Sequence, residues 1–257
     1  MTAGDPGHDR RRLPIRSYVL RGGRITRAQR RALDELLPRW GLPFVPAPLD
    51  LDAVFGRRAP RVLEIGFGDG ATLVELAALR PEADFLGVEV HPPGIGHCLL
   101  AIESRKLTNI RVIVHDAVEV LAAQISPASL DEILLYFPDP WPKKRHHKRR
   151  IVQPAFARLI ANRLKSGGVC RLATDWQPYA ERMAEVLNGV PGFVNPAPDG
   201  RWIERPSGRA ATRFETRGRR LGHRVYYLEY RRIGPASTLP EQSHFALREG
   251  DADASGA

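Results

Sequence analysis

The stretch FPDPWPKKRHHKRR, residues 137–150, places an acid and an aromatic ring directly before a run of basic residues. Asp139 lies between two prolines, which restrict φ and would hold its carboxylate in one position. Trp141 offers a flat face on which a nucleobase could stack. A rigid acid can accept hydrogen bonds from the N–H groups of a base and orient it for reaction. The simpler alternative is a proline-stiffened turn with Trp141 in the core.

Eight consecutive basic or titratable residues follow this loop. A charge run is usually a solvated face, and one rich in Lys and Arg can be a localisation signal. Here it adjoins the loop of Asp139, which favours phosphate binding. His146 and His147 are adjacent, so they lack the spacing of paired helical metal ligands, and we expect them to contact nucleic acid or solvent. The run comprises Lys143, Lys144, Arg145, His146, His147, Lys148, Arg149 and Arg150.

A second basic segment covers residues 205–224 and contains seven arginines. Glu215 is the single acid within it. One interpretation is an ordinary ion pair with a neighbouring arginine. The other is functional: Glu215 orients an arginine or accepts a hydrogen bond from a substrate base.

Three glycines, Gly66, Gly68 and Gly70, follow a short apolar strand in the stretch VLEIGFGDGA. Glycine at such a turn lets the backbone bend sharply and approach a ligand closely. Gly66, Gly68 and Ala71 also satisfy the dinucleotide fingerprint G-x-G-x-x-G/A, and Glu89 lies at about the right distance for a ribose contact. The loop by itself therefore fits either NAD or S-adenosylmethionine (SAM).

Three acids at the ends of successive strands favour SAM. Glu64 would lie near a sulfonium and an ammonium group, where a pyrophosphate would be repelled. Glu89 can accept both ribose hydroxyls, and Asp116 can accept from an adenine amino group. For each acid taken alone, the alternative is an ordinary polar residue at the point where a strand ends. Together with the glycine loop, the three predict an adenosine pocket at the carboxyl edge of a parallel sheet.

Alternating strands and helices must position these residues. Repeated units of this length predict a parallel sheet with helices on both faces. The expected strands are 61–65, 84–90, 110–116, 130–137, 167–175 and 223–232, and the expected helices are 71–79, 95–106, 150–164 and 179–187.

The ends of the chain have a different character. Residues 26–40 predict a helix capped by Thr26, and a proline-rich connector follows it. We expect a disordered basic tail over residues 1–12, one domain over 13–231 and a flexible tail over 232–257.

Composition limits the partners of the chain. Its 257 residues carry a net charge of +10, which makes polyanions the first candidates. The two cysteines, Cys98 and Cys170, cannot form a disulfide framework and are expected to be buried, reduced thiols. The sequence lacks an apolar run of about 18 residues and a signal-peptide core, so we expect no membrane association and a cytoplasmic location.

The chain resembles the TrmB family of tRNA (guanine-N7-)-methyltransferases, in its bacterial single-chain form, over roughly residues 12–231. The resemblance rests on LEIGFGDG, FLGVEVHPPGIG, HDAVEVL, FPDPWPKKRHHKRRIVQ, LATDWQPYAE and TRFETRGRRLGH. It implies an α/β fold of class I SAM-dependent methyltransferases, with a Rossmann-like sheet of seven mostly parallel strands. It also implies methyl transfer from SAM to N7 of a variable-loop guanosine of tRNA, at position 46.

The resemblance also implies roles for individual residues. Asp139 is the catalytic residue, and the RNA-interaction stretch is Arg145–Arg150. Where the family usually has T-K-F-E, this chain has Arg213 in place of Lys. The positive charge is kept, but a forked guanidinium group replaces the point charge of an ammonium group. The family's cofactor acids fall on Glu64, Glu89, Asp116 and Asp139, and its substrate contacts fall on Lys143, Asp175, Thr212, Arg213, Phe214 and Glu215.

Guanine N7 carries a lone pair and no proton, so the reaction needs no strong general base. We therefore expect Asp139 and Asp175 to act by positioning the base. The alternatives are a methyltransferase for another base, a NAD(P)-dependent oxidoreductase and a non-catalytic RNA-binding protein. The expected partner is tRNA, without an obligate protein partner or a metal, for a monomer or homodimer.

Overall fold

The computed structural model describes residues 16–19, 23–205, 215 and 224–234. Its helices are α1 (Arg27–Glu35), α2 (Leu37–Trp40), α3 (Leu51–Phe55), α4 (Ala71–Leu79), α5 (Pro92–Ser104), α6 (Ala117–Ala123), the 3₁₀ helix η1 (Lys144–Arg149), α7 (Pro154–Arg163) and α8 (Gln177–Asn188). Its strands are β1 (Gly41–Leu42), β2 (Arg61–Ile65), β3 (Asp84–Glu89), β4 (Ile110–Val114), β5 (Leu130–Tyr136), β6 (Leu164–Thr174), β7 (Phe193–Val194) and β8 (Tyr226–Arg232).

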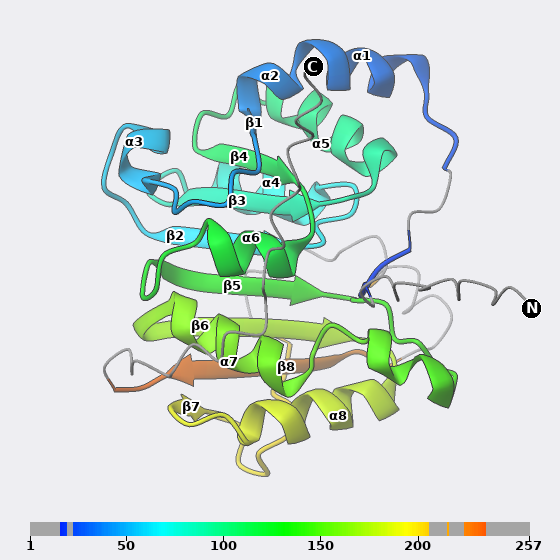
Figure 1. Ribbon diagram of the computed structural model, residues 1–257, viewed down its shortest axis with the longest axis vertical. Helices are drawn as coiled ribbons and strands as arrows, with labels where there is room; N and C mark the ends of the chain where they lie inside the picture. Colours follow the sequence, from blue (N-terminus) through cyan, green and yellow to red (C-terminus); the bar gives the residue numbers. More distant parts are fainter. Residues whose placement is uncertain (1–15, 20–22, 206–214, 216–223, 235–257) are drawn as a thin grey trace, which may run out of the picture.

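The strands form one mixed sheet in the order β1-β4-β3-β2-β5-β6-β8-β7 (Figure 1). The pairs from β1 to β6 are parallel, and β8 runs antiparallel to β6 and β7. This arrangement confirms the expected α/β fold. The sheet described here has eight strands where the resemblance implied seven, because the two-residue strands β1, inside the proline-rich connector, and β7 lie at its two edges.

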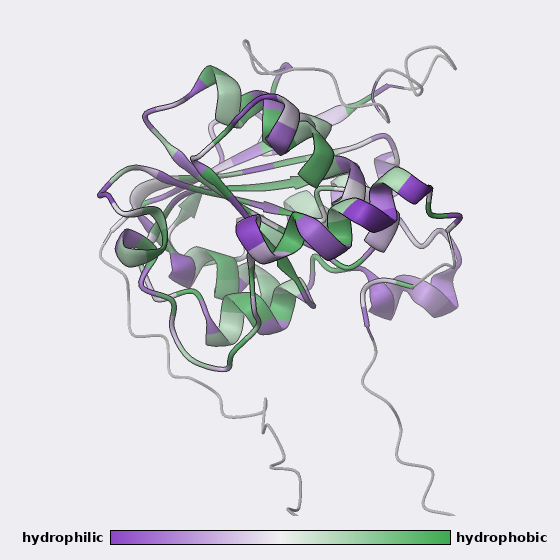
Figure 2. Cartoon of the chain, turned by 90° about the horizontal axis from the view of Figure 1, so that it is seen from above, coloured by the Kyte–Doolittle hydropathy of each residue, from purple (hydrophilic) through white to green (hydrophobic). Residues whose placement is uncertain are grey.

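Helices cover both faces of the sheet, so the central strands are buried on both sides. Leu63 and Ile65 belong to the apolar cluster that includes residues of α6, α7 and α8. Val62 belongs to the other cluster, with residues of α1, α4 and α5. Figure 2 shows the resulting apolar strands running between the helices. This is why the strands read as continuous apolar runs in the sequence.

The N-terminal helix begins as expected. The Thr26 side chain accepts a hydrogen bond from the Gln29 backbone, and the Gln29 side chain accepts one from the Thr26 backbone, which is a capping box. The helix expected over residues 26–40 is divided, because α1 ends at Glu35 and α2 starts afresh with Pro38 in its first turn.

The parallel strands β2 to β6 end at one edge of the sheet, on the right in Figure 1. The register pairs Ile65 with Val88 and with Leu135, so the loops that follow β2, β3 and β5 leave the sheet side by side. The loop after β6 follows in the same way, because Tyr136 pairs with Ala173. Among the described residues, no helix is long and apolar enough to cross a membrane.

Candidate active site

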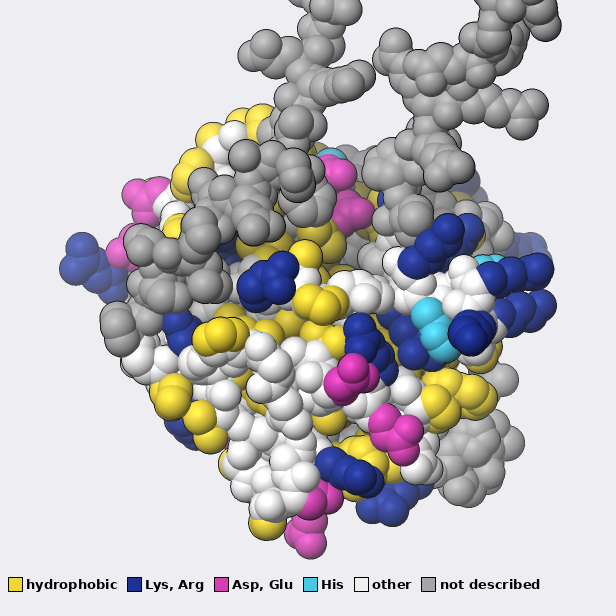
Figure 3. Space-filling view, turned by 60° about the horizontal axis from the view of Figure 1, so that its bottom comes forward, with side chains coloured by type: hydrophobic (Ala, Val, Ile, Leu, Met, Phe, Trp, Pro, Cys, Tyr) yellow, Lys and Arg dark blue, Asp and Glu magenta, His cyan; other side chains and the backbone are white. Residues whose placement is uncertain are grey.

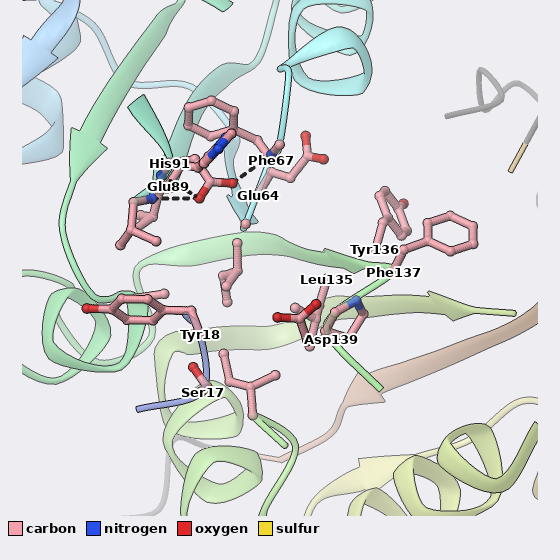
Figure 4. A pocket seen from close by; sticks show the side chains of 18 of the residues that line it. Ser17, Tyr18, Glu64, Phe67, Glu89, His91, Leu135, Tyr136, Phe137 and Asp139 are labelled. Atoms are coloured by element: carbon pink, nitrogen blue, oxygen red, sulfur yellow. Dashed lines mark hydrogen bonds between the residues drawn. The ribbon is translucent and has the colours of Figure 1, made fainter. Parts of the chain in front are cut away.

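A cavity of about 410 Å³ lies at this edge of the sheet. Its walls come from the loops after β2, β3, β4 and β5 and from residues 17–19 near the start of the chain. Figure 4 shows Glu64 and Glu89 on one side of the cavity, with Asp139 and Ser17 across from them. The volume lies within the usual range for small-molecule and cofactor sites.

Gly66 and Gly68 line the cavity with left-handed backbones, at φ 67° and 61°. A Cβ at either position would meet nothing within 4 Å, so the backbone angle rather than space demands glycine.

Gly70 behaves differently from the other two glycines. It caps α4 at φ 76°, and a Cβ there would lie 2.4 Å from Cys98 Sγ. It is not among the residues that line the cavity. The lack of a side chain at Gly70 therefore lets α4 approach α5, and its cofactor contact stays a prediction.

Glu89 is fixed by backbone amides. The Gly68 N–H donates to its Oε2 at 2.8 Å, and the amides of Val90 and His91 donate to Oε1 at 2.6 and 3.0 Å. The carboxylate thus ties the glycine loop to the end of β3, with lone pairs remaining for further donors. This is the position expected of a ribose-binding acid.

Glu64 and Asp116 differ in their relation to the cavity. Glu64 is only 3% exposed, yet it lines the cavity at the end of β2. Asp116 caps α6 by accepting the Val118 N–H at 2.8 Å, and it is not among the lining residues. Its neighbours His115 and Ala117 take that place on the wall. The contact from Asp116 to an adenine amino group stays a prediction.

The loop after β5 carries Asp139 into the cavity. Phe137 and Trp141 bracket it with left-handed backbones at φ 51° and 42°, which non-glycine residues rarely adopt. The Phe137 N–H donates to the Ala173 carbonyl at 2.8 Å and anchors the start of the loop on β6. Asp139 is exposed between them and lines the cavity. Two strained residues thus hold the acid that the sequence singled out.

Trp141 does not line the cavity, contrary to its predicted role as a stacking face there. Its Nε1 donates to the Ser17 carbonyl at 3.2 Å, and the Arg149 guanidinium lies 5.2 Å from its ring centroid. His146 meets the ring edge-on. The ring therefore fastens η1 to the N-terminal segment, whose residues Ser17, Tyr18 and Val19 form part of the wall.

The basic run forms η1 and divides by exposure. Lys143, Lys144, Arg145 and Lys148 are exposed, and His146, His147 and Arg149 are half-buried. Figure 3 shows Lys, Arg and His side chains gathered at the right of the molecule, on the side where Figure 1 places η1. The flanking Lys and Arg side chains add to partial desolvation in lowering the pKa of His146.

Arg150 differs from the rest of the run because it is buried, at 5% exposure. Its Nε donates to the Pro140 carbonyl at 2.8 Å, and its guanidinium lies 4.8 Å from the Tyr179 ring centroid. Through these two contacts it braces the loop of Asp139 against α8.

The predicted substrate contacts are described only in part, because Thr212, Arg213 and Phe214 lie outside the described residues. Glu215 is fully buried and accepts hydrogen bonds from Arg205 Nε at 2.8 Å and the Tyr227 hydroxyl at 2.7 Å. The ion-pair interpretation of Glu215 thus holds. Burial alone would lower the pKa of Arg205, but bonding to Glu215 outweighs it and raises that pKa.

Asp175 lies near the cavity without lining it. It is exposed directly after β6, beside the loop of Asp139.

Residues missed by the sequence reasoning complete the wall. His115 stacks on Phe44 with ring centroids 3.7 Å apart, and its Nε2 lies 2.5 Å from Glu119 Oε2. Ser17 and Tyr18 come from a segment that showed only basic composition. Ser17 and Tyr18 belong to no local motif, because their place on the wall joins distant parts of the chain, whereas His115 stands at the start of HDAVEVL.

The fold and this cavity define the class: the chain is a class I SAM-dependent methyltransferase. The residues present fit SAM, since the carboxylates of Glu64 and Glu89 and the glycines Gly66 and Gly68 line a cavity of sufficient size. Among solved structures, the 16S rRNA methyltransferase KamB matches with a TM-score of 0.52 and 17% identity, over 72% of this chain and 93% of that chain. The antibiotic-resistance methyltransferase Kmr matches with a TM-score of 0.51 and 18% identity, over 75% and 95%.

Sequence relatives identify the family. A family profile described as "Putative methyltransferase" matches residues 58–228. The tRNA (guanine-N(7)-)-methyltransferase of Stutzerimonas stutzeri is 55% identical over 86% of this chain and 93% of its own length. That of Shewanella woodyi is also 55% identical, over 85% and 92%. The chain belongs to the tRNA (guanine-N(7)-)-methyltransferase family, and the NAD-dependent alternative is thereby excluded.

Proposed function

We propose that this chain transfers a methyl group from SAM to N7 of a guanosine in the variable loop of tRNA, at position 46. One observation carries the proposal. Asp139 lines the same cavity as the cofactor acids Glu64 and Glu89, and the exposed basic run begins just after it at Lys143. A base held by Asp139 would thus meet the cofactor while its backbone lies on η1.

The residues that line the cavity have different roles toward the cofactor. When bound, SAM supplies an electrophilic methyl group on a positively charged sulfur. Glu89, held by three backbone amides, accepts the ribose hydroxyls, and Glu64 offers negative charge to the positive end of the cofactor. Gly66 and Gly68 let the backbone lie close to the ligand.

Asp139 and Asp175 orient the base. Guanine N7 has an in-plane lone pair and no proton, so the chain needs to supply alignment rather than a strong base. Both acids leave neighbouring parallel strands at the cavity edge and can accept hydrogen bonds from the N–H groups of guanine. The strained backbone at Phe137 and Trp141 limits the motion of Asp139 and lowers the entropy lost on alignment.

The partner and the compartment belong to the same proposal. Exposed cations on η1 bind the phosphates of tRNA. The buried free thiols Cys98 and Cys170 suit a reducing cytoplasm. The oligomeric state proposed is a monomer or a homodimer.

The decisive experiment uses SAM with a labelled methyl group and a tRNA transcript. Label should enter the transcript, and digestion to nucleosides should yield N7-methylguanosine. A transcript with the variable-loop guanosine changed to adenosine should accept no label. Label on an exocyclic amine would favour another base methyltransferase, and unchanged labelling of the altered transcript would overturn the proposed position.

A further inference from the structure

A second hollow, of about 280 Å³, lies between η1 and the helix α8. It is distinct from the cofactor cavity, and the two share no lining residue. Its lining residues are His147, Lys148, Arg150, Gln153 and Arg182. Three of these side chains are cationic, a fourth can become so, and none is an acid. Such a lining is suited to an anion.

Arg150 is the fixed part of this hollow. Its Nε is used by the Pro140 carbonyl and its plane is stacked near Tyr179, so the terminal Nη groups remain for a ligand. Burial is the largest effect on the pKa of Arg150 and lowers it, Tyr179 raises it by a smaller effect, and repulsion from Arg182, smaller still, lowers it. Two guanidinium groups close enough to repel one another are stabilised by an anion between them.

Arg182 is the adjustable part. Its side chain is 36% exposed, and its Nη1 lies 2.7 Å from Glu185 Oε1 on the next turn of α8. Glu185 is 69% exposed, so water screens this pair and an incoming anion can compete for the guanidinium. Gln153 is held by the carbonyls of His147 and Arg150, which fixes the floor of the hollow to η1.

The hollow is connected to the reactive loop. Arg150 bonds the carbonyl of Pro140, the residue directly after Asp139. Burial raises the pKa of Tyr179 to about 12, and Arg150 and Asp139 act on the same hydroxyl in opposite directions. Arg150 is therefore tied to the loop of Asp139 through Pro140. An anion in the hollow would be held in a fixed relation to a base at Asp139.

We propose that this hollow binds one backbone phosphate of the substrate RNA, that of the target guanosine or of a nucleotide next to it. Arg182 and Arg150 bind the phosphate oxygens in the forked geometry that arginine offers to phosphate. The phosphate then fixes how far the nucleotide can enter, while Asp139 fixes the angle of its base. This inference rests on the proposed function and adds Arg182, outside every motif of the sequence, to the substrate site.

The test compares Arg182→Ala with Arg158→Ala. Arg158 is exposed on α7 and lines neither cavity, so both variants lose one helical surface arginine. Loss of one phosphate contact should reduce the slope of log K for tRNA against log salt by about 0.7 in Arg182→Ala and leave it unchanged in Arg158→Ala. Arg182→Lys should keep the slope but bind tRNA more weakly, because lysine lacks the forked guanidinium group. SAM affinity should be equal in all variants.

A footprint locates the phosphate. Transcripts with random phosphorothioates are bound to wild type or variant and cleaved with iodine. Arg182→Ala should lose protection at a phosphate flanking the methylated guanosine and retain protection elsewhere, while Arg158→Ala keeps the whole pattern. An unchanged footprint, or protection lost only at a distant phosphate, would refute the subsite. Absence of N7-methylguanosine with the wild-type enzyme would instead refute the proposed function, so the two failures are distinguishable.

Discussion

At the scale of single residues, Asp139 is the side chain on which the proposed chemistry depends most. Asp139→Ala should reduce turnover at saturating SAM by about 100-fold or more, because a base misplaced by about 1 Å already loses that much rate. Initial rates with a tRNA transcript provide the measurement. SAM affinity, measured by titration calorimetry, should change less than turnover.

Asp34 offers a matched control for this substitution. It is exposed on α1, away from the cavity lining, so Asp34→Ala should keep wild-type turnover. Near wild-type turnover of Asp139→Ala would show that the carboxylate does not position the base.

Trp141 shows what residue patterns could not predict. Its type and its place beside Asp139 suggested stacking in the cavity, but its ring is engaged by Ser17, Arg149 and His146. Ser17 lies 124 positions away from Trp141 in the chain, and no local sequence spacing predicts such a contact. Glu64, Glu89 and Asp139 line the cavity because each lies at or just beyond the end of a strand that the sheet holds in place.

At the scale of elements, the junction of α4 with α5 depends on Gly70. Gly56 also has a left-handed backbone, at φ 69°, but a Cβ there would meet nothing within 4 Å. Gly56→Ala should therefore cost about 1–2 kcal/mol from the backbone alone. Gly70→Ala should cost about 1–3 kcal/mol more, because its Cβ collides with Cys98.

Urea unfolding of both glycine variants provides the comparison. Equal losses in free energy of unfolding would mean that α4 and α5 separate without cost. In that case Gly70 would be needed for its backbone angle alone.

The elements themselves were largely predictable. The range 71–79 agrees with α4, and six expected strands correspond to β2, β3, β4, β5, β6 and β8, because apolar runs between turn residues mark strands buried on both faces. The two-residue strands β1 and β7 were missed. Two residues carry no periodicity, and pairing with β4 alone makes Gly41 and Leu42 a strand. Tertiary pairing of this kind is not encoded locally.

At the scale of the whole molecule, charge determines how RNA is held. Arg145 and Lys148 are exposed on η1, so replacing both with Ala should reduce the slope of log K for tRNA against log salt by about 1.4, or 0.7 per phosphate. Binding by fluorescence anisotropy over a salt series measures this slope.

Removing Arg58 and Arg105 changes net charge equally at the opposite edge of the sheet. Both residues are exposed near the starts of strands, away from η1, so the slope should stay unchanged. Equal effects of the two double variants would make RNA binding a matter of net charge alone.

The buried thiols give a pH-dependent prediction for the fold. Burial raises the pKa of Cys170 to about 12 from 9.0 and also raises that of Cys98. A pKa raised by folding contributes stability that is full below pH 9.0 and is lost as pH rises toward about 12. At about pH 8 both thiols stay protonated, so iodoacetamide should alkylate them only as fast as the protein unfolds.

Mass spectrometry of the native and the urea-unfolded protein gives the number of alkylated thiols in each state. The unfolded chain should be alkylated at both cysteines within the time in which the native protein stays unmodified. Fast labelling of the native protein would contradict the burial of these thiols.

The position of residues 16–19 has a consequence for where the functional unit begins. The family profile starts at residue 58, and a fragment cut there would retain the glycine loop, Asp139 and the basic run. It would lack Ser17 and Tyr18, one wall of the cofactor cavity, together with the partner of Trp141. The part of the chain that the profile matches and the part that encloses the cavity thus have different boundaries. A fusion joined close to Ser17 would place foreign residues at the mouth of that cavity.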